Sequence, residues 1–147
     1  MRKTYIVLFS IFIIAHTLNC FQSSIAIFPL RSYGDIKTDF IYYLLATEIN
    51  ARFELDLITK DQINEKYDNT NCDDATLINI ARELNAGFCL IGEVNNSKEK
   101  SGYNIYLRII DVKTGYIIST PVIYMDGIDR YHGTLGEFKE IFDALEE

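Results

Sequence analysis

The 147-residue sequence has very little histidine, and this shortage excludes several kinds of catalytic and metal chemistry. His16 lies in the N-terminal apolar stretch, so His132 is the only imidazole in the rest of the chain. One histidine cannot build a His-rich metal site, and no serine or cysteine motif surrounds it. We interpret His132 as an exposed loop residue, and the sequence predicts no catalytic, cofactor-binding or metal-binding residue.

Basic residues are also scarce, and no glycine-rich phosphate loop is present. The chain has 14 Lys and Arg against 21 Asp and Glu, a formal net charge of −7. Such a chain repels a phosphate backbone, which argues against nucleic acid as a partner. Neither G-x-G-x-x-G nor a Walker loop occurs, and residues 68–74 ("DNTNCDD") lack the glycine and terminal Glu of a calcium loop. We therefore expect no cofactor.

The N-terminal apolar run is short. Residues 5–15 are too few to span a bilayer comfortably but suit the apolar region of a secretory signal. Arg2 and Lys3 supply the positive charge that precedes such a region. The sequence predicts a signal peptide over residues 1–19 and export to the periplasm or to the membrane-anchored cell envelope.

Cys20 follows this segment and is a candidate for lipidation, as the first residue of a mature bacterial lipoprotein. The usual motif has Leu three residues before the cysteine and Gly, Ala or Ser immediately before it, whereas this chain has Leu18 and Asn19. Ordinary cleavage nearby and an uncleaved anchor are the alternatives. With lipidation, residues 20–24 would tether the domain to a membrane.

Only two cysteines remain beyond Cys20, and the stretch between them predicts that they do not form a disulfide. Residues 73–87, between Cys72 and Cys89, have the pattern of a helix of about 13 residues, with Asp73 or Asp74 as its cap and Gly87 at its end. Such a helix is ~20 Å long, and a disulfide needs Cα atoms within ~7 Å.

Apolar side chains make up 48% of the chain, which is enough for one domain and one core. Their periodicity predicts an α/β fold: a single-domain sandwich over residues 25–147 in which helices pack on a mixed β-sheet. Residues 88–94 are apolar on both faces, as in a central strand. The expected strands are 25–30, 53–58, 88–94, 103–112 and 116–125, and the expected helices are capped by Asp35, Thr59 with Gln62, Asp73 or Asp74, and Thr134 with Glu137.

One motif suggests an enzyme. Lys113-Thr114-Gly115 spells the KTG box of serine penicillin-binding enzymes, and Ser97 to Lys100 spells their S-x-x-K. However, Ser97 lies in a polar loop rather than at the start of a buried helix, no S-D-N box is present, and the chain is too short for that fold. We interpret residues 113–115 as a hairpin turn with Gly115 in a left-handed conformation.

The C-terminal stretch has the pattern of an amphipathic helix. Its apolar face consists of Phe138, Ile141, Phe142 and Leu145. This face either packs on the domain's own sheet or binds a partner in helix-in-groove fashion, so these four residues are candidate partner-binding residues.

From Ile25 to Tyr124 the chain resembles an envelope-protein superfamily. Its members include the TolB N-terminal domain, the curli-secretion lipoprotein CsgG and the LpoB-type lipoprotein activators of penicillin-binding proteins. The resemblance rests on the first strand "IAIFPL", the stretch "FELDLITKDQI", the Ala-Gly that leads into "FCLIGEV", and the strand–turn–strand "RIIDVKTGYIIS". These motifs are structural, and they carry no catalytic residues to transfer.

The resemblance implies an exported, non-enzymatic accessory or binding module that acts through contacts with envelope proteins, with self-association into a homo-oligomer left open. One alternative is a structural subunit of a larger envelope or flagellar-associated assembly, and another is a small hydrolase or acyl-transfer enzyme. CsgG-type pores insert two amphipathic hairpins per subunit. A single pair of long strands is predicted here, which argues against a secretion pore.

Overall fold

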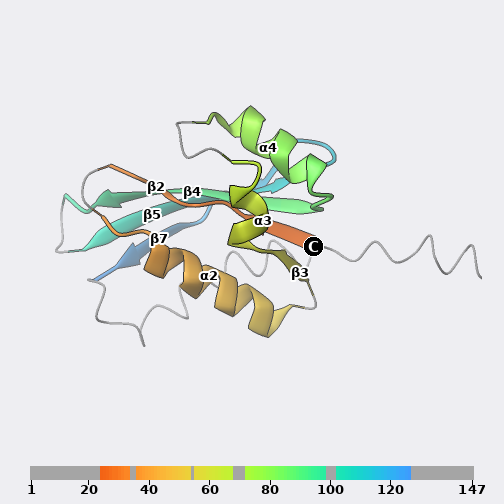
Figure 1. Ribbon diagram of the computed structural model, residues 1–147. Helices are drawn as coiled ribbons and strands as arrows, with labels where there is room; N and C mark the ends of the chain where they lie inside the picture. The colour runs from red at the N-terminus through yellow and green to blue at the C-terminus, as the bar shows by residue number, and fades with distance from the viewer. Residues whose placement is uncertain (1–23, 34–35, 54, 68–71, 99–101, 127–147) are drawn as a thin grey trace, which may run out of the picture.

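A computed structural model of the chain describes residues 24–33, 36–53, 55–67, 72–98 and 102–126. These residues form a single α/β domain in which helices pack on a mixed sheet, as predicted (Figure 1). The strands are β1 (Ser24–Ile27), β2 (Arg31–Ser32), β3 (Asp56–Ile58), β4 (Phe88–Asn96), β5 (Tyr103–Asp111), β6 (Ile117–Ser119) and β7 (Val122–Met125). The helices are α2 (Asp39–Arg52), α3 (Lys60–Asn64) and α4 (Asp74–Glu83). No helix of this described part is long and apolar enough to cross a membrane.

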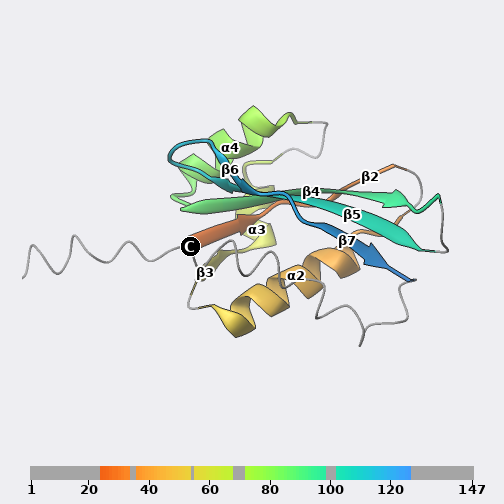
Figure 2. The same ribbon diagram turned by 180° about the vertical axis from the view of Figure 1, so that it is seen from behind.

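The sheet has seven strands, and its main order is β3-β1-β4-β5-β6. β1 runs parallel to β3 and β4, whereas β5 is antiparallel to β4, β6 and β7. β2 also pairs with β4, beyond the end of β1. Figure 2 shows the long β4–β5 pair from behind, with β6 and β7 along its other side. The β4–β5 pair is therefore the centre of the sheet, and every other strand except β3 pairs with one of these two.

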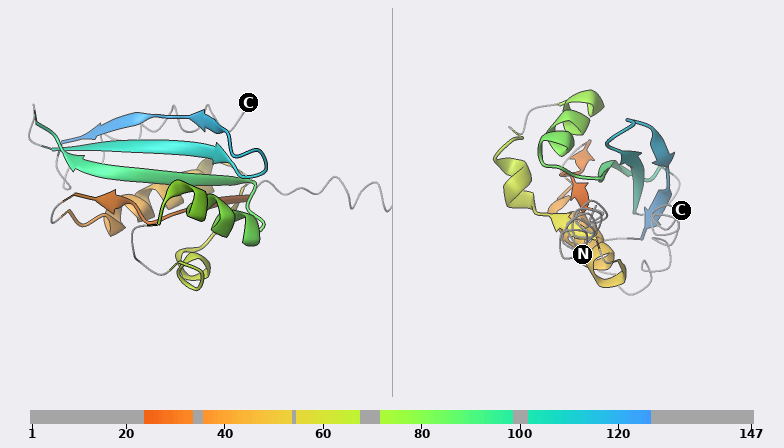
Figure 3. Two further views of the ribbon diagram at one scale, coloured as in Figure 1. Left: turned by 90° about the horizontal axis from the view of Figure 1, so that it is seen from above. Right: turned by 90° about the vertical axis from the view of Figure 1, so that its right-hand side faces the viewer.

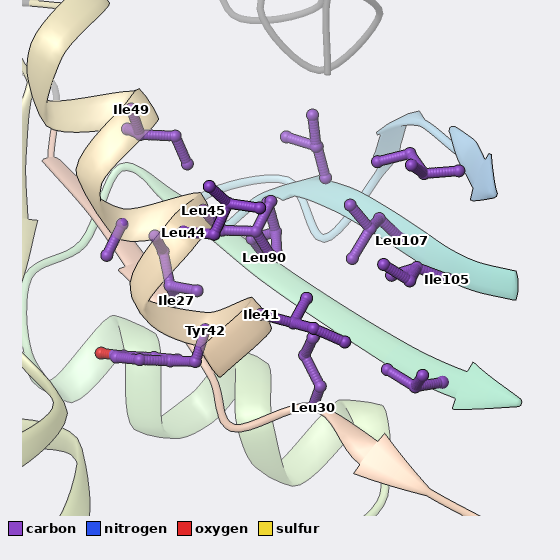
Figure 4. Close-up of a cluster of buried hydrophobic side chains, with 14 of the residues drawn as sticks. Ile27, Leu30, Ile41, Tyr42, Leu44, Leu45, Ile49, Leu90, Ile105 and Leu107 are labelled. Carbon is purple, nitrogen blue, oxygen red and sulfur yellow. The ribbon is translucent and has the colours of Figure 1, made fainter. Parts of the chain in front are cut away.

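Two hydrophobic clusters lie on opposite faces of the sheet. α2 contributes Ile41, Leu45 and Ile49 to the first cluster, where they meet Leu90 of β4 and other strand residues (Figure 4). The second cluster lies under α3 and α4. Figure 3 shows α2 and α4 on the two sides of the sheet. A period of two in β4 explains this arrangement, because Leu90 and Val94 face one cluster while Cys89 and Ile91 face the other.

Local capping follows the sequence closely at two helices. At the start of α3, the backbone N–H of Gln62 donates to the Thr59 hydroxyl, and the backbone N–H of Thr59 donates to the Gln62 side chain, which completes the predicted capping box. The Asp73 carboxylate accepts from the backbone N–H of Thr76 at 2.8 Å and so caps α4. Asp35, the expected cap of α2, lies outside the described residues, and that helix begins at Asp39.

Three details of the predicted elements were wrong. α4 has 10 residues, and the left-handed residue after it is Asn85 (φ 56°), not Gly87. Neither proline-containing stretch is one continuous strand. Pro29 separates β1 from β2, and Pro121 separates β6 from β7. Proline has no N–H to donate to a ladder, so each strand is interrupted at its proline.

Cys72 and Cys89 are both free thiols, of which Cys72 is half-buried and Cys89 is buried. The guanidinium of Arg31 donates to the Cys72 carbonyl at 2.6 Å, and Arg31 lies in register with Glu93 of β4. Arg31 of β2 therefore holds the segment before α4, whereas Cys89 lies within β4.

Candidate functional site

The KTG motif is a turn. The Asp111 carboxylate accepts from the backbone N–H of Thr114 at 2.9 Å, and the Asp111 carbonyl accepts from the N–H of Gly115 at 2.8 Å. Gly115 has φ +73°, the left-handed conformation that the sequence predicts. The side chain that organises the turn is thus Asp111, and Lys113 is exposed.

The two halves of the supposed acyl-transfer motif lie at opposite ends of β5. Ser97 lies in the β4–β5 loop, where its N–H donates to the Gly102 carbonyl at 2.9 Å, and Lys113 follows the other end of the strand. Nine strand residues span about 30 Å. Ser97 and Lys113 therefore cannot share a catalytic site within the domain. Lys100 lies outside the described residues.

A ring of four charged side chains crosses the α4 side of the sheet beyond the second cluster. Asp74 pairs with both Arg31 and Arg108, and Glu93 pairs with the same two arginines at 3.6 Å. All four side chains are about one-third exposed. The sequence suggested only helix capping for Asp73 and Asp74, but Asp73 is the cap and Asp74 an ion-pair partner. The ring is electrically neutral and ties the start of α4 to β2, β4 and β5.

Next to this ring, α4 leaves one end of the sheet uncovered, and four strands contribute one residue each to a row. Asn95 of β4 lies opposite Asn104 of β5, which lies opposite Tyr124 of β7. Tyr33 extends β2 beside β4, since its N–H donates to the Val94 carbonyl at 3.4 Å. We call Tyr33, Asn95, Asn104 and Tyr124 the amide–tyrosine row. It lines a shallow groove of about 700 Å³ together with Tyr106.

A second exposed feature is the apolar edge of the sheet, which we call the β6 edge. It consists of Tyr116, Ile117, Ile118 and Val122, all of them exposed. Ile117 is 53% exposed and Val122 is 58% exposed. β6 ends the strand order of the sheet, and among the residues that the structure describes no strand pairs with its outer side.

Two predicted sites lie outside the described residues: the lipidation candidate Cys20, and the C-terminal face of Phe138, Ile141, Phe142 and Leu145. The predicted loop residue His132 also lies outside them. Among the residues in the described ranges, no group of three His, Cys, Asp or Glu could hold a metal ion. The sequence pattern did not indicate the amide–tyrosine row or the β6 edge. Alternation along residues 103–112 could have indicated which residues share a face, but not which strands lie beside them.

Comparisons with known proteins concern the fold. No protein-family model matches the chain, and no curated protein is detectably similar in sequence. Among solved structures, the domain is similar to the C-terminal domain of LpoB from Escherichia coli. The TM-score is 0.60 and the identity is 14%, over 71% of this chain and 84% of that one.

Two further structures share the fold. The lipoprotein GNA1162 from Neisseria meningitidis matches with a TM-score of 0.58 and 13% identity, over 85% of this chain and 97% of that one. TolB from Acinetobacter baumannii matches with a TM-score of 0.57 and 14% identity, over 83% of this chain but only 28% of the longer TolB. The described domain therefore has the fold of the LpoB C-terminal domain, in agreement with the sequence resemblance.

Proposed function

We propose that the protein is an exported, non-enzymatic accessory domain of the cell envelope that acts by binding another envelope protein. The observation that carries this proposal is the β6 edge, where large apolar side chains surround a strand with an open side. Monomeric proteins usually cover or charge such an edge, because it is a template for pairing with another chain. Exposed apolar clusters mark sites of protein contact.

The form of the edge suggests how a partner would bind. Ile117 and Ile118 are consecutive in a strand and therefore point to opposite faces, yet both are exposed. A strand of the partner could pair with the backbone of β6 while its side chains cover these two isoleucines, which is strand addition. A second copy of this chain would bind in the same way, and that case corresponds to the alternative of a structural subunit.

Site-specific crosslinking tests the proposal in cells that express the full chain. A photoreactive residue at Ile117 should crosslink to a defined envelope protein, whereas one at Tyr43 of α2, which is 59% exposed, should not. Crosslinks only between copies of the chain would favour the structural subunit. Equal crosslinking from both positions, or none from Ile117, would contradict the proposal.

Attachment to a membrane through Cys20 completes the proposal. The charged start, the short apolar run and the cysteine that follows support it. A radiolabelled fatty acid should enter the wild-type protein but not a Cys20→Ala variant. Equal labelling of both proteins, or labelling of neither, would remove the lipid anchor and leave the β6 edge unaffected.

The C-terminal helix predicted from the sequence is a second candidate surface for a partner. The apolar face of this helix either packs on the domain's own sheet or binds a partner. It consists of Phe138, Ile141, Phe142 and Leu145. The same crosslinking experiment, with the photoreactive residue at Phe142, distinguishes contacts within the chain from contacts with another protein.

A further inference from the structure

The amide–tyrosine row is built by strands that are far apart in the sequence. Neighbouring strands lie about 4.8 Å apart, so four residues in one row extend about 14 Å across the sheet. The two amides occupy the middle, on β4 and β5, and the two tyrosines lie on the outer strands. This width is that of an extended ligand several rings long, lying across the strands.

The two amides in the middle are available to a ligand. Asn95 and Asn104 are half-buried, and neither side chain makes a hydrogen bond to any of the residues that the structure describes. Each amide offers two N–H donors and an oxygen with two acceptor positions. A sugar hydroxyl also both donates and accepts, so two adjacent amides match the hydroxyl pairs on the edge of a sugar ring.

Aromatic rings flank the amides. Tyr33 is 64% exposed, and Tyr106, in the next row on the same face, is also exposed. Tyrosine presents a rigid apolar ring with only two side-chain torsions, so little conformational entropy is lost when a ligand packs on it. The C–H faces of a pyranose ring are apolar and flat enough to stack on such a ring, while the hydroxyls at its rim stay polar.

The charges around the groove favour a neutral ligand. The nearby ions Arg31, Asp74, Glu93 and Arg108 pair with one another and leave no excess of either sign. Lys98 is the only charged residue among those that line the groove in the described part of the chain. An anionic polymer would meet too few cations in a protein of net charge −7.

We propose that this groove binds a neutral oligosaccharide, with the amides of Asn95 and Asn104 on its hydroxyls and the rings of Tyr33 and Tyr106 against its C–H faces. The groove is shallow, so a longer glycan could continue beyond it at both ends. This activity goes beyond the protein contact proposed above and uses a different surface. A glycan and a protein could therefore bind to one domain independently.

The experiment uses the full chain, purified in a detergent that lacks a sugar headgroup. Saturation-transfer NMR and calorimetry with chitotetraose, cellotetraose and maltotetraose should show that at least one of them binds, with Kd of about 1 mM or tighter. Tyr33→Ala and Asn104→Ala should each weaken that binding by about tenfold. Tyr33→Phe should bind like the wild type, because it keeps the ring.

Two control variants test whether the binding is specific to this groove. Tyr43→Ala removes a tyrosine of similar exposure from α2 and should leave the Kd unchanged, and so should Ile117→Lys at the β6 edge. If none of the three tetrasaccharides binds, the proposal is overturned. The proposal is also overturned if Tyr33→Ala binds like the wild type. Because Tyr33 is highly exposed, this variant should fold, and it remains informative even if Asn104→Ala does not.

Discussion

Gly115, in the turn after β5, and Gly92, in the middle of β4, are needed for different physical reasons. At Gly115 a Cβ would meet nothing within 4 Å, so only the backbone conformation requires glycine there. At Gly92 a Cβ would lie 2.5 Å from Cδ2 of Leu107 and 2.7 Å from Cδ2 of Leu30. β4 therefore uses glycine to let its neighbours pack closely, and the turn uses it for a positive φ.

The turn gives a prediction at the residue scale. Gly115→Val should lower the free energy of unfolding by ~1 kcal/mol or more, because a β-branched residue resists a positive φ. Lys113→Ala should change it little, since that side chain is exposed. Urea denaturation measures both variants, and Gly115→Asn is the matched control, because asparagine tolerates this conformation better. A silent Gly115→Val, or covalent labelling of Ser97 by a penicillin, would contradict the assignment of a turn.

The elements that the sequence predicted well depend on local interactions. The capping box of Thr59 and Gln62 involves residues three apart, and the two-sided apolar run at 88–94 identifies a central strand by composition alone. Pro29 and Pro121 were visible in the sequence as well. Their missing N–H groups could have predicted the interruptions that divide each apolar stretch into two strands.

The surface features could not be predicted in this way because they depend on register between distant segments. Asn95 and Asn104 become neighbours only through the β4–β5 pairing, and Tyr33 and Tyr124 join them from opposite ends of the domain sequence. Asp74 similarly meets Arg31 and Arg108 from two other strands. A one-residue shift in any of these pairings would move the side chains to the opposite face.

α4 provides a prediction about the cysteines that flank it. Cys72 and Cys89 should remain unlinked to each other, because both are free thiols in this fold and the helix α4 lies between them in the chain. Alkylation under denaturing, non-reducing conditions should label both thiols, or find them paired between chains. In the native state Cys89 should be alkylated far more slowly than Cys72, because burial raises the pKa of its thiol to about 12. A peptide that links Cys72 to Cys89 would contradict the α4 assignment.

On the scale of the whole molecule, each side of the sheet buries one side chain that is a weak acid. Tyr42 lies in the cluster under α2, and burial, with the neighbouring Tyr43 and Asp61, raises its pKa to about 12. Cys89 lies in the cluster under α3 and α4, where burial, with the nearby Asp74, raises the pKa of its thiol to about 12. Neither core can take up a negative charge without losing contact with its apolar surroundings.

Alkaline pH should therefore destabilise both halves of the domain. The unfolded chain releases these protons near their ordinary pKa values of 9.0 for the thiol and 10.0 for the phenol, whereas the folded protein keeps them up to about pH 12. Between these limits the folded state binds more protons, so the free energy of unfolding must fall as the pH rises.

Urea titrations at pH 8, 10 and 11.5 would show this decline. The general repulsion of an acidic chain at high pH adds to this decline, so the comparison with variants is decisive. Tyr42→Phe and Cys89→Ala should each make the free energy of unfolding depend less steeply on pH, even if either variant is less stable than the wild type at pH 8. Tyr116→Phe, which removes an exposed phenol, should leave the slope unchanged. Identical slopes in all four proteins would show that these two groups do not govern alkaline stability.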